Sequence, residues 1–176
     1  MNDIYGINAF TLPLAWLTAL ATSELRLTIY SLRWLYGIVR YLHLAGMACF
    51  VGMVVIVDLR GLGLFPPGSL DAVRPRLVKV LNTSFWLTIG TGVLLFLRDP
   101  LGVGLHTMFL PKLVLIVFGY VWAAGLRRVR RAPWLRKPGA AISLAVWLTV
   151  IGASTWNHVE RPVMVGQALR LHNVGK

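Results

Sequence analysis

Four apolar runs of helical length constrain this chain more than any other feature of its sequence. They cover residues 41–57, 80–97, about 108–126 with Lys112 near the start, and about 140–157. A helix needs about 20 mainly apolar residues to cross the ~30 Å hydrocarbon core of a bilayer, and each run with its polar ends approaches that length. The runs predict an all-α integral membrane protein, built as a four-transmembrane-helix bundle.

The composition agrees with a membrane protein and excludes an ordinary soluble domain. The chain is 57% hydrophobic and 14% charged, with a mean hydropathy of +0.69, whereas soluble domains are roughly 45–50% apolar. The formal net charge of +12 comes from basic residues between the runs. We therefore expect the lipid bilayer, with its anionic headgroups, and not nucleic acid, as their partner. Cys49 is the single cysteine, which excludes an internal disulfide and a cysteine-cluster metal site.

Residues 1–40 predict an N-terminal interfacial amphipathic segment on the outer side of the bundle. In residues 4–23 apolar side chains recur at helical spacing, and Trp16 is typical of an anchor at headgroup level. Polar residues dilute this run, so an interfacial helix is favoured over another span. Residues 41–158 are then the transmembrane domain and residues 159–176 a polar C-terminal tail. The glycine-rich residues 101–106 predict a tight turn or surface loop.

The basic residues also predict the orientation of the bundle. Lysine and arginine close to spans tend to stay on the cytoplasmic side, and the loops after the first and third runs are the most basic. With four spans, both termini then lie on the outer side of the membrane. The ten basic residues of these two loops are Arg60, Arg74, Arg76, Lys79, Arg127, Arg128, Arg130, Arg131, Arg136 and Lys137.

Three histidines fall at the outer ends of the predicted spans. His43 opens the first span, His106 precedes the third and His158 closes the fourth. Facing helices of a bundle bring side chains together at one depth, and imidazole is an axial ligand of haem and a ligand of copper. His43 is the main candidate, because an ionisable residue inside a membrane marks a possible site. His158 and His106 are the candidates for a second haem ligand.

Each of these residues also has a structural interpretation. His43 is alternatively a polar residue hydrogen-bonded near the headgroups, and His106 and His158 are alternatively surface residues. Gly46 and Gly52 follow His43 in the same span. They would let a flat ring approach the helix, or would serve ordinary packing of helices through small residues.

Asp58 and Arg60 lie together at the cytoplasmic end of the first span. They form either a structural ion pair between helices or a charged helix end that meets the headgroups. The sequence contains no nucleophile elbow, zinc-protease or nucleotide-binding motif, and hydrolytic or nucleotide-driven chemistry is therefore not expected. The chain is more typical of a subunit or carrier than of a stand-alone enzyme.

Most of the chain, residues 31–153, resembles a family of four-helix bacterial inner-membrane proteins of unknown function. That family is in turn similar to the copper-resistance D and cytochrome b561-like membrane proteins. The resemblance is most specific in RYLHLAGMACFVGMVVIVDLRGLG, which contains His43, Gly46, Gly52, Asp58 and Arg60, and it extends more loosely to TGVLLFLRDP, FLPKLVLIVFGYVWAAGLRR and SLAVWLTVIGA. It implies a multi-pass protein of the bacterial inner membrane, with both predicted outer termini in the periplasm. Cytochromes of the b561 type carry several histidines inside their spans, whereas this chain carries one.

Three functions are consistent with these features. The first is a membrane electron-transfer subunit that binds one b-type haem near the periplasmic face and passes electrons between a periplasmic redox subunit and quinone. The second is a non-catalytic accessory or anchor subunit of a larger membrane complex. The third is copper handling, with His43 as a metal ligand.

Overall fold

The computed structural model describes residues 11–66, 68, 70, 72–128 and 136–174, of which residues 127–128 and 157–174 are described by their backbone alone. This part of the chain contains helices and no strand. In chain order the helices are α1 (Leu14–Ala21), α2 (Glu24–Ser31), α3 (Arg33–Leu62), α4 (Arg74–Arg98), α5 (Pro100–Gly104), α6 (Phe109–Arg128) and α7 (Arg136–Val174).

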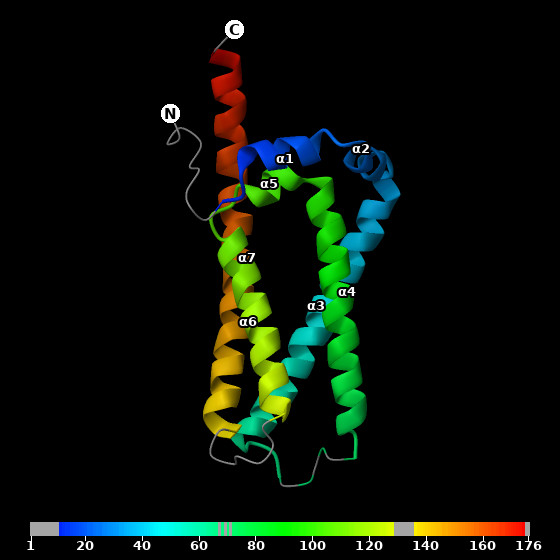
Figure 1. Cartoon of the computed structure of the whole chain (residues 1–176), viewed down its shortest axis with the longest axis vertical. Coiled ribbons are helices and arrows are strands. Elements are labelled where there is room, and N and C mark those ends of the chain that lie inside the picture. The colour runs from blue at the N-terminus through cyan, green and yellow to red at the C-terminus, as the bar shows by residue number, and fades with distance from the viewer. Residues whose placement is uncertain (1–10, 67, 69, 71, 129–135, 175–176) are drawn as a thin grey trace.

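The long helices α3, α4, α6 and α7 form the bundle, and α1, α2 and α5 lie across one end of it (Figure 1). We call this end the capped end. Helix α3 packs against both α4 and α7, and α7 packs against α6. Four segments are long and apolar enough to cross a membrane, which confirms the predicted number of candidate spans. They are Arg33–Leu62, Arg74–Arg98, Phe109–Leu126 and Arg136–Trp156.

Local sequence signals explain several helix ends. Ser23 caps α2, because its hydroxyl accepts a hydrogen bond from the backbone N–H of Arg26 at 3.3 Å. Helix α3 ends at Gly63, whose φ of 87° is the left-handed conformation that glycine adopts without strain. Asp99 caps α5 by accepting from the N–H of Gly102 at 3.0 Å, and Pro100 occupies the first helical position. Residues 101–104, expected as turn or loop, therefore belong to a short helix.

Two long helices extend beyond the predicted spans. Helix α3 begins at Arg33, so the last part of the expected interfacial segment of residues 1–40 is divided between α2 and the first spanning helix. Helix α7 continues to Val174, so its backbone includes most of the residues expected as a polar tail. The interfacial position of the N-terminal segment and the orientation of the bundle stay predictions, and residues 1–10 lie outside the described part.

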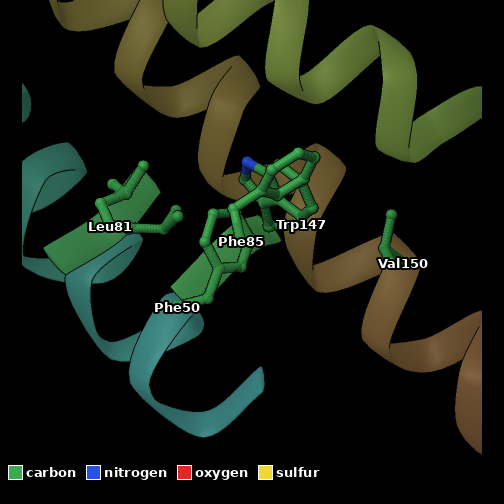
Figure 2. Close-up of a cluster of buried hydrophobic side chains, with 6 residues drawn as sticks. Phe50, Leu81, Phe85, Trp147 and Val150 are labelled. Carbon is green, nitrogen blue, oxygen red and sulfur yellow. The ribbon is translucent and has the colours of Figure 1, made fainter. Parts of the chain in front are cut away.

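An aromatic cluster holds the bundle together (Figure 2). Phe50 of α3 contacts Trp147 of α7 edge to face, with ring centroids 4.6 Å apart, and Phe85 of α4 at 5.3 Å. Phe85 also stacks on Tyr120 of α6 at 4.4 Å. Tilted and edge-to-face pairs of this kind contribute about 0.5–1.5 kcal/mol each beyond the area that they bury. One cluster thus joins all four long helices.

The outside of the bundle is apolar, as expected for a surface in contact with lipid. On α6 the side chains of Val114, Val117 and Val121 are 67%, 63% and 62% exposed. Their spacing places them on one face of the helix. At the capped end, Leu17 of α1 is fully buried against Gly104 of α5, where no side chain intervenes.

Candidate functional site

His43 lies in the half of α3 nearer the capped end and is held by α4. Its ring atom Nδ1 lies 3.0 Å from the backbone oxygen of Thr88 and 3.1 Å from the hydroxyl oxygen of Thr91. The side chain is half-buried between the two helices. The structure therefore fixes the imidazole ring by contacts that cross from one spanning helix to another.

These two partners determine which ring nitrogen carries the proton of neutral His43. The carbonyl of Thr88 accepts only. The hydroxyl proton of Thr91 is directed to the carbonyl of Leu87, at 2.6 Å, so its oxygen is also an acceptor for the ring. Nδ1 must then donate, and the lone pair of the neutral ring is at Nε2. Histidines that bind metals are commonly oriented by such an Nδ1–H···O=C bond.

Gly92 and Lys112 complete the surroundings of the ring. A Cβ at Gly92 would lie 3.2 Å from Cε1 of His43 and 3.6 Å from Nδ1, so any other residue there would obstruct the approach of the ring to the Thr88 carbonyl. Lys112 of α6 is close enough to act electrostatically on His43. The site thus combines an oriented imidazole on α3, acceptors on α4 and an ammonium group on α6.

The two glycines that follow His43 have different surroundings. A Cβ at Gly46 would lie 2.9 Å from Oγ1 of Thr88 and 3.4 Å from the side chain of Leu87, so α4 covers this glycine closely. Nothing lies within 4 Å of the corresponding position at Gly52. Gly46 therefore permits close packing of α3 and α4, and the approach of a flat ring to either glycine stays a prediction.

The other candidate ligands lie toward the capped end. His106 follows α5 and is only 4% exposed, which differs from the surface position considered for it. At this end of the bundle α1 packs against α5, the helix that His106 follows. His158 follows the spanning part of α7, and its side chain lies outside the described part. Among the described residues, no group of three His, Cys, Asp or Glu side chains could hold a metal ion.

At the opposite end of α3, Asp58 is 6% exposed and its carboxyl group interacts with the hydroxyl of Ser143 on α7. The other carboxyl oxygen is buried and has no hydrogen-bond partner in the described part of the chain. The ion pair of Asp58 with Arg60 stays a prediction, since the contact that the structure provides is to a neutral hydroxyl group.

Sequence reasoning did not single out Thr88 or Thr91 as partners of His43. A signal was present, because two threonines three residues apart within an apolar run share one face of a helix. Their pairing with His43 depends on how α3 and α4 align, which the pattern of a single span does not contain.

No protein-family model, curated protein or solved structure matches this chain.

Proposed function

We propose that this protein is a membrane electron-transfer subunit that binds one b-type haem near the periplasmic face, and that His43 would hold the haem. The observation that carries the proposal is the orientation of His43. Its Nδ1–H is engaged by acceptors on α4, which leaves Nε2 as the nitrogen with a free lone pair. A haem bound there would supply reversible one-electron transfer.

The residues around His43 suit an axial ligand in two respects. The hydrogen bond to the Thr88 carbonyl orients the ring and raises the basicity of Nε2. Lys112 provides a cation near the ring, which is suited to the carboxylate of a haem propionate. His106 or His158 would be the second histidine that holds the haem.

The first test is the visible spectrum of the protein purified in mild detergent from haem-supplemented cells. We expect b-type bands in the reduced-minus-oxidised spectrum and their loss in His43→Ala. The matched control is His172→Ala, which alters a histidine beyond the spans and should keep the bands. His106→Ala and His158→Ala, made separately, identify the second ligand.

A flat spectrum of the wild type, or bands that persist in a folded His43→Ala variant, would refute the proposal. Gel filtration and circular dichroism of each variant separate loss of haem from loss of fold. In a haem-free protein, co-purification with larger membrane subunits would favour the accessory function, and copper retained through detergent exchange would favour copper handling.

A second test addresses the orienting contacts without changing His43. Thr91→Val removes one of the two acceptors at Nδ1, and we expect haem affinity to fall by roughly tenfold, the lower end of the range for partners that orient a ligand. The control is Thr149→Val, because the hydroxyl of Thr149 donates only to its own helix, to the carbonyl of Ala145 at 2.9 Å. Equal haem affinity of the two variants would contradict the orienting role.

A further inference from the structure

Three arginines and two tyrosines gather at the capped end, where α2, the start of α3 and the end of α4 meet. We call Arg26, Tyr30, Tyr36, Arg40 and Arg98 the arginine–tyrosine cluster. The Cζ atom of Arg98 lies 4.1 Å from the ring centroid of Tyr36 and 5.0 Å from that of Tyr30. Arg26 lies 4.6 Å from the ring centroid of Tyr30, and Arg40 lies 6.0 Å from that of Tyr36. The guanidinium group of Arg98 is thus flanked by two rings, each shared with a second arginine.

The hydrogen bonds of two cluster arginines go to uncharged groups. Arg26 donates through Nε to the backbone oxygen of Arg98 at 3.4 Å, and Arg40 donates through Nη1 to the hydroxyl of Tyr36 at 3.3 Å. Both acceptors are neutral, so these bonds do not offset the charge of either arginine. The neighbouring carboxylate of Asp99 caps α5 by accepting from Gly102.

Two features of the cluster favour binding of a further group: the repulsion between neighbouring arginines and a guanidinium nitrogen without a hydrogen bond. Arg26 and Arg98 both lie within 5.0 Å of one ring centroid, so their like charges are closer than the Debye length of about 10 Å at 0.1 M salt. Nη1 of Arg98 is buried and makes no hydrogen bond within the described part of the chain. The side chain of Arg98 as a whole is partly exposed, so an anion that approaches from outside the bundle would meet its guanidinium group and offset the repulsion between the arginines.

Phosphate oxygens suit these donors, because guanidinium groups bind them through paired, charge-assisted hydrogen bonds. The aromatic faces hold Arg98 in place through cation–π contacts, so the donor is already oriented before an anion arrives. Tyrosine is also typical of the level at which lipid headgroups lie. The chemistry and the position both point to a phosphate group at the membrane surface.

The surface beside the cluster favours a lipid over free phosphate. Leu44 follows Arg40 by one turn on α3 and is 49% exposed, and Leu94 precedes Arg98 by one turn on α4 and is 38% exposed. Residues four apart share one face of a helix, so exposed apolar side chains continue from these two arginines along the spanning helices, where the acyl chains of a lipid would lie. Inorganic phosphate would make no use of these side chains.

We propose that the arginine–tyrosine cluster binds the phosphodiester headgroup of an anionic phospholipid, with its acyl chains along Leu44 of α3 and Leu94 of α4. Arg98 is the central donor, and Arg26 and Arg40 contribute from either side. This lipid is a specific ligand at one place on the bundle, in addition to the lipid that surrounds any membrane protein. The proposal does not depend on the binding of haem.

The test measures lipid binding to delipidated full-length protein in detergent by native mass spectrometry. The probes are dioleoylphosphatidylglycerol, dioleoylphosphatidylcholine and inorganic phosphate. We expect one phosphatidylglycerol to bind preferentially, and Arg98→Gln to weaken that binding by about tenfold or more, as expected for loss of a hydrogen bond to a charged group. The matched control is Arg33→Gln, because Arg33 is an exposed arginine of the same helix end with no contact to either ring.

A second variant keeps the test decisive if Arg98→Gln does not fold. Arg40 is exposed, so Arg40→Gln should fold and still weaken phosphatidylglycerol binding more than Arg33→Gln does. Equal binding of phosphatidylcholine, or equal effects of the cluster variants and the control, would overturn the proposal. Displacement of phosphatidylglycerol by millimolar inorganic phosphate would show a phosphate site instead of a lipid site.

Discussion

The contact of Gly61 on α3 with Ala140 on α7 gives a stability prediction that depends on a single methyl group. A Cβ at Gly61 would lie 2.7 Å from Cβ of Ala140 and 3.7 Å from the backbone oxygen of Arg136. Ordinary contacts between such atoms are 3.4–4 Å. Ala140 is 4% exposed, and its Cβ cannot rotate away, so Gly61→Ala must push the two helices apart.

The change in the free energy of unfolding that Gly61→Ala causes is the sum of two opposing effects. Overpacking of a well-packed contact costs about 1–3 kcal/mol, whereas replacement of glycine by alanine in a helix gains about 0.4–1 kcal/mol because the unfolded chain loses freedom. Gly52→Ala, on the same helix, isolates the second effect, since nothing lies within 4 Å of a Cβ there. We expect Gly61→Ala to be less stable than Gly52→Ala by about 1–3 kcal/mol, the overpacking cost alone.

The assay is reversible unfolding of the purified protein in mixed micelles of mild detergent and dodecyl sulfate. The double variant Gly61→Ala with Ala140→Gly removes the clash and should recover most of the loss, which a double-mutant cycle reports as a coupling energy of roughly 0.5–3 kcal/mol between neighbours. Equal stability of Gly61→Ala and Gly52→Ala, or zero coupling to Ala140→Gly, would refute the close approach of α3 to α7.

Two further predictions concern the interior of the bundle. Trp147→Ala removes the ring that contacts Phe50 and should lower the free energy of unfolding by about 3–5 kcal/mol in the same assay; a loss below 1 kcal/mol would show that the aromatic cluster does not hold the bundle. Ser143→Ala deprives the buried carboxyl of Asp58 of its hydroxyl partner and should cost about 1–3 kcal/mol. Ser154→Ala is its control, since that hydroxyl donates within its own helix to the carbonyl of Val150, and equal losses would contradict the prediction for Ser143.

The spanning helices were predictable because hydropathy is a property of each segment taken alone. The uncharged runs at residues 41–57 and 80–97 lie inside α3 and α4, and the charged residues Asp58 and Arg98 mark the predicted ends closely. The start of α3 was harder, because Arg33 and Arg40 are compatible with either a helix at the membrane surface or the exposed end of a spanning helix. Helix α5 was missed because glycines suggested a turn, although Asp99 and Pro100 provide a cap and a first turn.

The site was less predictable, since it depends on contacts between segments. His43 was identified from its position in a span, but its partners Thr88 and Thr91 required the alignment of α3 with α4. The burial of His106 was not predicted, because it depends on tertiary packing that the sequence pattern of its own segment does not contain. Arg98 directly follows the second predicted span, and its place between two tyrosine rings comes from the packing of both α2 and the start of α3 against the end of α4.

Thr88 links the packing of the bundle to the orientation of the candidate ligand. Its hydroxyl side faces Gly46, where an added Cβ would lie 2.9 Å away, while its backbone carbonyl faces Nδ1 of His43 at 3.0 Å. Gly92, one turn later on α4, leaves the space through which the ring reaches that carbonyl. The two glycines therefore act together. Gly46 allows α3 to lie close to α4, and Gly92 leaves room for the His43 ring to reach the Thr88 carbonyl across that short distance. The direction of Nε2 is consequently a property of the helix pair, and a substitution at either glycine would displace the ring without altering the histidine itself.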